Sequence, residues 1–115
     1  MARGLTRGDV RLARIGASDK VRPVVVLTRG SMIGSLDSVT VAPITSTIRG
    51  VPSEVPLDAS DGMKAPCAVN LHHVSTVRRD TLGRWVATLR PDRLEQICVA
   101  LEHALGCRTR SLDTP

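Results

Sequence analysis

Two apolar runs of this 115-residue sequence carry polar side chains suited to phosphate chemistry. The first run, residues 22–28, begins with Arg22, and the second, residues 39–47, ends with three hydroxyl side chains, Thr45, Ser46 and Thr47. If the runs form neighbouring strands, the guanidinium lies beside the hydroxyls at one end of the sheet. Arginine presents a rigid fork of donors that matches phosphate oxygens. The sequence therefore predicts a phosphodiester site at that sheet end.

The charge and the aromatic content limit the ways in which this chain could bind a nucleic acid. The net charge is +5, and fourteen of the sixteen basic residues are arginines, concentrated in residues 1–30 and 78–115. Arginine favours bidentate phosphate contacts, although a GC-rich coding sequence would also enrich it without any nucleic-acid role. The chain has no Phe, no Tyr and a single Trp. This composition argues against binding by base stacking on aromatic platforms.

Length and composition predict one soluble domain in the cytosol. A chain of 115 residues supports one modest core. No apolar run approaches the roughly 20 residues that cross a bilayer, and residues 1–10 lack the apolar segment of a secretory signal. The three cysteines form no CxxC pair. We therefore expect reduced thiols, no zinc site and no membrane association.

The hydrophobic pattern predicts a mainly β fold with one helix. Apolar residues at helical spacing, Pro91 near the start and Gly106 at the end predict an amphipathic C-terminal helix between these positions. The expected strands are residues 8–15, 23–28, 38–44, 54–57, 67–71 with an extension at 74–77, and 83–89. Residues 16–20 are expected to form a turn, 30–37 a loop with at most one helical turn, and 108–115 a tail. The pattern is typical of a small curved antiparallel barrel or sheet with the helix packed on it.

Four blocks of the sequence, taken in order, resemble the MazF family (PemK/MazF-like) of toxins from bacterial toxin–antitoxin systems. The blocks are RGDV at 7–10, RPVVVL at 22–27, VAPITSTIRG at 41–50, and VNL at 69–71 followed by VSTV at 74–77 and LG at 82–83. The likeness spans about residues 7–106. It implies an SH3-like barrel of the CcdB/MazF type, a single toxin domain at 1–107 and a homodimer.

The resemblance also implies a function. Members of the family are sequence-specific, metal-independent endoribonucleases that cleave single-stranded RNA, leaving 2′,3′-cyclic phosphate and 5′-hydroxyl ends, without a cofactor. A cognate MazE-like antitoxin inhibits them through an acidic, disordered segment laid across the RNA groove. The catalytic residues of the family fall on Arg22 and Thr45 of this sequence.

The chemistry agrees with these assignments. The substrate supplies its own 2′-hydroxyl as nucleophile, so the protein must mainly stabilise the phosphorane, and the donors of Arg22 suit that task. A pKa above 12 makes Arg22 a poor proton carrier, whereas His72 and His73 titrate in a useful range. On a strand, these two histidines would face opposite sides. The candidates for RNA binding are Ser46, Thr47, Arg49, Asn70, His72, Arg78, Arg79 and Arg84.

Several alternatives stay open at this point. Arg49, Arg78, Arg79 and Arg84 fit an exposed turn or rim equally well, Asn70 fits a turn cap, and Asp9 a structural role. Trp85 fits the core or a dimer interface better than a stacking platform. Relative to many family members, the chain lacks aromatics after RGD, has a short loop at 16–20, and carries His72-His73 in place of an acidic residue and an amide. The competing functions are a non-catalytic toxin that binds a protein such as a topoisomerase, and a small basic nucleic-acid-binding barrel.

Overall fold

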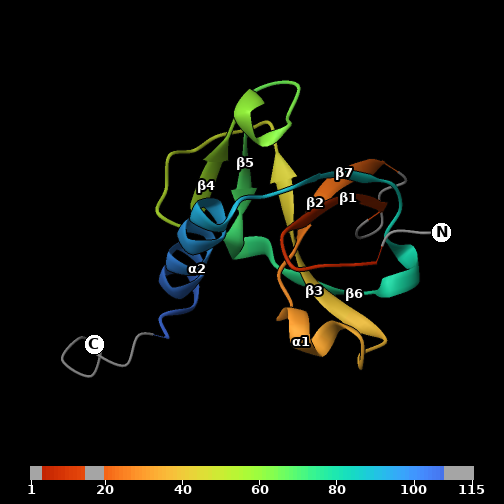
Figure 1. The fold of residues 1–115 in the computed structure, drawn as a ribbon. Helices are drawn as coiled ribbons and strands as arrows, with labels where there is room; N and C mark the ends of the chain where they lie inside the picture. The colour runs from red at the N-terminus through yellow and green to blue at the C-terminus, as the bar shows by residue number, and fades with distance from the viewer. Residues whose placement is uncertain (1–3, 15–19, 108–115) are drawn as a thin grey trace.

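A single curled antiparallel sheet forms the body of the molecule in the computed structural model, which describes residues 4–14 and 20–107 (Figure 1). Its strands are β1 (Asp9–Arg14), β2 (Val21–Val26), β3 (Ser38–Thr45), β4 (Glu54–Leu57), β5 (Cys67–Asn70), β6 (Ser75–Arg78) and β7 (Trp85–Thr88). Neighbouring strands follow the order β4-β5-β3-β2-β1-β7, and β6 pairs with β3. Every recorded pairing is antiparallel, so the predicted fold class is confirmed.

One long helix packs against this sheet. Helix α2 (Pro91–Leu105) has proline at its first position and ends at Gly106, whose φ of +68° allows the left-handed cap that glycine adopts without strain. The predicted bounds of this helix are confirmed. The short helices are α1 (Gly30–Ile33), η1 (Ala59–Asp61), η2 (Leu71–His73) and η3 (Arg79–Thr81). Among the residues described, no helix is both long and apolar enough to cross a membrane.

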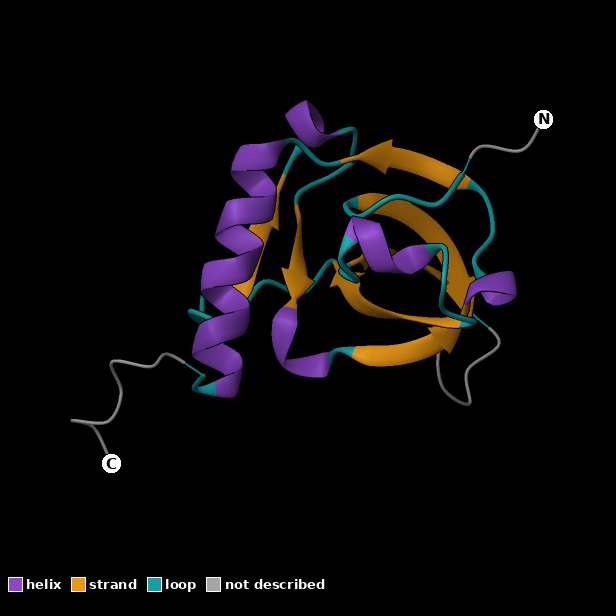
Figure 2. Ribbon diagram, turned by 60° about the horizontal axis from the view of Figure 1, so that its bottom comes forward, coloured by secondary structure: helices purple, strands orange, loops and turns teal. Residues whose placement is uncertain are grey.

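Apolar side chains fill both faces of the central strands. Val25 belongs to the cluster that includes Ile97 and Ala100 of α2, whereas Val24 and Val26 belong to a second cluster inside the curl of the sheet. Figure 2 shows the strands curling beside α2. Successive residues of a strand point to opposite faces, so a strand covered on both sides reads as a continuous apolar run. This explains the unbroken valines of β2.

Prolines mark the point where β2 and β3 stop pairing. The ladder between them runs from Val26↔Val41 to Val24↔Pro43, and the next residue of β2 is Pro23. Neither proline has an N–H to donate to a ladder. Beyond this point β3 continues along β5, with Ile44↔Val69 and Thr45↔Ala68 as partners. The ends of β2 and β3 are therefore not joined to each other by recorded ladder pairs.

Three expectations about elements are wrong in detail. The second strand begins at Val21 and ends at Val26, so Arg22 lies within the strand and Pro23 is its third residue. His72 lies in the 3-10 helix η2, which forms the kink between β5 and β6, and not on a strand. The last strand covers only Trp85–Thr88. The expected turn at 16–20, apart from Lys20, and the expected tail at 108–115 lie outside the described residues.

Candidate nucleic-acid interface

Arg22 and Thr45 lie in one groove at the end of the β2–β3 ladder. The β2–β3 ladder ends at Val24↔Pro43, two residues short of Arg22 and of Thr45. Both residues line a hollow of about 550 Å³, which we call the groove. The other residues that line it are Leu12, Pro23, Ile44, Ser46, Gly62, Met63, Lys64, Ala65, Pro66, Cys67, Arg84 and Val86.

Three cationic side chains of the groove are exposed and available to a ligand. Arg22, Lys64 and Arg84 are solvent-exposed, and no side-chain hydrogen bond or ion pair is recorded for them within residues 4–14 and 20–107. Unpaired cations gathered in one hollow raise the local concentration of a polyanion. The electrostatics of the groove therefore favour a nucleic-acid backbone.

Thr45 is the last residue of β3, and its hydroxyl shapes the turn that follows. The Oγ1 of Thr45 donates a hydrogen bond to the carbonyl oxygen of Thr47 at 3.0 Å, which leaves the oxygen able to accept a further hydrogen bond. Because the strand ends at Thr45, Ser46 and Thr47 lie beyond it. Ser46 lines the groove, whereas Thr47 is not among the lining residues.

Aliphatic and sulfur-containing side chains supply the rest of the groove surface. Leu12, Ile44, Met63 and Val86 line it, so an unstacked base would meet an aliphatic wall and not an aromatic ring. Burial, together with the nearby carboxylates of Asp61 and Asp58, raises the pKa of Cys67, which keeps this thiol protonated near neutral pH.

The two histidines belong to a separate polar cluster. Ser53 Oγ and His72 Nδ1 lie 2.6 Å apart, Asn70 Nδ2 and His73 Nδ1 lie 3.1 Å apart, and Asn70 Oδ1 accepts from the backbone N–H of His72. We call these four residues the histidine turn. Asn70 caps η2, so the capping role is confirmed. The structure does not bring His72 or Asn70 into the lining of the groove.

The remaining arginine candidates are also placed away from the groove. Arg49 lies in the loop before β4, where its backbone N–H and that of Gly50 both donate to Glu54 Oε1 at 3.0 Å. Arg78 pairs with Asp80 at 2.9 Å, and Arg79 donates to a backbone oxygen. None of these arginines lines the groove, so Arg84 is the candidate from that group that joins Arg22 there.

A buried carboxylate organises the strands beside the groove. Asp9 is fully buried and accepts hydrogen bonds from Thr6 and from Thr88 Oγ1, the latter at 2.8 Å. Burial raises the pKa of Asp9, but these hydrogen bonds outweigh it and hold the pKa below its usual value of 3.8. Trp85 Nε1 donates to Thr88 Oγ1 at 2.9 Å. With 40% of its surface exposed, Trp85 is not a core residue.

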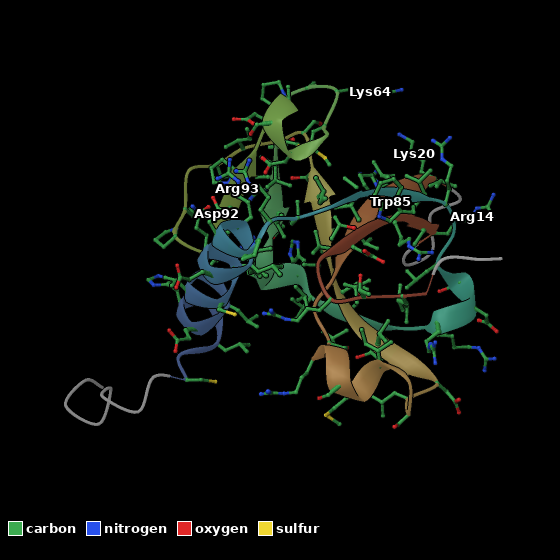
Figure 3. All side chains as sticks on the ribbon, viewed as in Figure 1. Arg14, Lys20, Lys64, Trp85, Asp92 and Arg93 are labelled. Carbon is green, nitrogen blue, oxygen red and sulfur yellow. The ribbon has the colours of Figure 1, made fainter. Side chains whose placement is uncertain are left out.

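Reasoning from the sequence missed the far wall of the groove. We give the name far wall to residues 62–67, all of which line the groove. Figure 3 shows Lys64 projecting from this loop, which follows η1. The available signal was Lys64 itself, one of only two lysines, two residues after Gly62 in a loop rich in turn residues. In the part of the chain that the structure describes, no three His, Cys, Asp or Glu side chains gather as a metal site would need.

Comparison with known proteins places this chain in a family. Residues 6–105 match the model of the PemK-like, MazF-like toxins of type II toxin–antitoxin systems. The chain is 38% identical to endoribonuclease MazF3 of Mycobacterium tuberculosis over 95 residues, which cover 83% of this chain and 92% of the relative. The solved structure of M. tuberculosis toxin MazF-mt6 superposes with a TM-score of 0.80 at 35% identity, covering 87% of this chain and 98% of the other.

A second solved structure is a mycobacterial endoribonuclease in complex with its cognate antitoxin. Its TM-score is 0.82 at 25% identity, with 91% of this chain and 98% of the other covered. The fold, the order of the sequence blocks and the length of the match to the family model agree with one another. The chain therefore belongs to the PemK-like, MazF-like toxins of type II toxin–antitoxin systems.

Proposed function

We propose that this toxin is an endoribonuclease that cleaves single-stranded RNA in the groove, with Arg22 and Thr45 as its catalytic residues. The observation that carries the proposal is that an exposed guanidinium, with no side-chain hydrogen bond or ion pair to the described residues, lines the same cationic groove as a threonine hydroxyl. The relative MazF3 is named an endoribonuclease, which supports the same activity here. We also propose that the protein acts in the cytoplasm, where cellular RNA would be its substrate.

The reaction is an internal transesterification. The 2′-oxygen of the substrate forms a bond to phosphorus and loses its proton, while the bond from phosphorus to the 5′-oxygen breaks and that oxygen gains a proton. The products are a 2′,3′-cyclic phosphate and a 5′-hydroxyl end. DNA lacks the nucleophile and is not cleaved. The protein therefore needs no nucleophile of its own.

Arg22 acts on the charge that develops at phosphorus. Its planar fork donates to two non-bridging oxygens, and donors held in place for the transition state are often the largest catalytic contribution. Thr45 donates to or orients one of the same oxygens when RNA displaces its contact with Thr47. Arg84 and Ser46, which line the same groove, bind the neighbouring backbone.

The partners follow from the same surface. A cationic groove suits an acidic, extended segment of a cognate antitoxin. Such a segment would compete with RNA for Arg22, Lys64 and Arg84. A relative of this fold is known in complex with its antitoxin. We also propose a homodimer, as the family resemblance implies. Val99 of α2, which is 59% exposed, adds apolar surface that such an assembly would cover.

The test is cleavage of a long single-stranded RNA in EDTA by the wild type and by Arg22→Ala. We expect discrete fragments with 2′,3′-cyclic phosphate ends from the wild type and intact RNA from the variant, at equal melting temperatures. Intact RNA in both reactions, with tight binding to a protein target, would favour the non-catalytic toxin. Equal cleavage by both proteins would remove Arg22 from the reaction.

A further inference from the structure

The far wall of the groove is fastened to the start of helix α2 by a buried ion pair. Asp61, whose side chain is 1% exposed, closes η1 and accepts a hydrogen bond from Arg93 Nε at 3.0 Å. Its second oxygen accepts from the backbone N–H of Asp58, also at 3.0 Å. One carboxylate therefore holds both ends of the η1 turn and joins that turn to α2.

Arg93 is itself fixed in place. Its side chain is 18% exposed, and its NH1 donates to Gln96 Oε1 at 3.0 Å one turn further along the helix. Arg90 approaches the same oxygen of Asp61 at 4.0 Å. A buried charge loses much of its hydration, so an Asp61 deprived of Arg93 would move toward water and carry its loop with it.

The residues after Asp61 enter the groove directly. Gly62 adopts a φ of +87°, and a Cβ there would lie 3.1 Å from Ala87 Cβ, so the chain turns back tightly against β7. Met63 is then buried while Lys64 reaches solvent at the groove. In Figure 3 Lys64 extends away from Arg93 and α2, toward the side of the molecule that carries Lys20 and Arg14. The ion pair thus anchors the start of the segment that carries Lys64.

We propose that the Asp61–Arg93 ion pair positions the far wall of the groove so that Lys64 contacts a backbone phosphate of the RNA beside the cleaved bond. Asp61 and Arg93 are positioning residues, and Lys64 is a binding residue. The inference rests on the proposed function, because it assigns a second phosphate contact to the same groove. Arg22 and Lys64 come from different segments of the chain and both line that hollow, so each can contact a different phosphate.

The test measures binding of a 2′-O-methyl RNA oligonucleotide, which cannot be cleaved, against salt concentration. Removing one phosphate contact lowers the slope of log Kd against log salt by about 0.7 for a single strand. We expect Lys64→Ala to lower the slope by that amount and to weaken binding about tenfold at low salt. We expect Asp61→Asn to produce the same change, and the double variant to match the single ones, because coupled residues are not additive.

Two further variants separate positioning from stability. Asp92→Asn breaks the exposed Arg90–Asp92 pair, 3.2 Å apart on the same helix turn, and we expect it to leave Kd and slope unchanged. Arg93→Lys keeps a positive charge beside Asp61 without the fork, and it provides a folded variant with an intermediate Kd should Asp61→Asn fail to fold.

An Asp61→Asn protein with a lower melting temperature but an unchanged slope would overturn the positioning role. So would additive effects in the double variant, and an unchanged slope in Lys64→Ala would remove the phosphate contact. These outcomes are independent of the cleavage test. RNA cleavage that depends on Arg22 supports the proposed function even if Lys64→Ala leaves the slope unchanged. If no RNA is cleaved, the binding measurement still tests the contact of Lys64 with phosphate.

Discussion

The groove lies at the Cys67 end of β5, and the histidine turn lies at its Asn70 end. Both regions are polar, and both contain residue types that catalyse reactions on phosphates. In the histidine turn, Ser53, Asn70, His72 and His73 satisfy one another through hydrogen bonds. In the groove, Arg22, Lys64 and Arg84 face solvent with no such partners among the described residues.

This difference indicates which polar residues serve structure and which serve a ligand. A histidine bonded to a buried serine holds a turn together, since the serine hydroxyl would otherwise lose a partner. A guanidinium without a protein partner at a groove breaks no protein contact when a phosphate arrives, and it gains a charge-assisted pair. Residue type alone does not make this distinction, because by type His72 is as good a catalytic candidate as Arg22.

The sharpest test of the comparison is Arg22→Lys, which keeps the charge of the groove and removes the fork. A lysine ammonium cannot hold two phosphate oxygens in one plane, so we expect the single-turnover cleavage rate to fall about 100-fold. The melting temperature should not change, because Arg22 is exposed. Arg29→Lys, at another exposed arginine, is the matched control. A rate within about threefold of wild type would mean that the positive charge alone, without the planar fork, accounts for the contribution of this position to catalysis.

The sequence located the centre of the groove for a simple physical reason. Two apolar runs had to pair to be buried, and pairing of adjacent runs brings the residue at the start of one beside the residue at the end of the next. That reasoning placed Arg22 near Thr45, and both residues line the groove. It could not place Lys64, because the path of the loop after β4 depends on Gly62 and on the salt bridge from Asp61 to Arg93, 32 residues further along the chain.

The histidine turn shows a different limit. The apolar pattern from Cys67 to Val77 suggested a kinked strand, but periodicity does not show where the kink falls. Asn70 is a strong N-cap residue, and its side chain accepts from the N–H of His72, which diverts the chain into η2. Local capping therefore overrode strand alternation and removed both histidines from the strand on which they were expected.

A third polar cluster surrounds Asp9, and its members are hydrogen-bonded to one another, like those of the histidine turn. This cluster predicts that the stability of the protein depends on pH. Because the pKa of Asp9 in the folded protein lies below 3.8, its contribution to stability is present above that pH and is lost as the pH falls through the folded pKa. We expect Asp9→Asn to lower the free energy of unfolding by about 2 kcal/mol at pH 7. The gap to wild type should close below pH 3.8.

Urea denaturation of both proteins from pH 7 to pH 2 measures that gap. Asp37→Asn, at an exposed carboxylate, is the control and should track the wild type throughout. A gap of constant size at every pH would show that Asp9 stabilises the strands by packing and not as a carboxylate. The cluster would then no longer stand as an example of polar groups held together by their own hydrogen bonds.

The smallest expected effect is that of His72→Ala, and it is the one that could undo the comparison. Loss of the imidazole leaves Ser53, which is 9% exposed, without its partner, so we expect the free energy of unfolding to fall by about 1 kcal/mol. The cleavage rate should stay within about threefold of wild type, as in the control His103→Ala on the exposed face of α2. A rate loss as large as that of Arg22→Lys, with the fold intact, would mean that the histidine turn moves to the RNA and transfers a proton. Pairing within the free protein would then not distinguish structural polar groups from reactive ones.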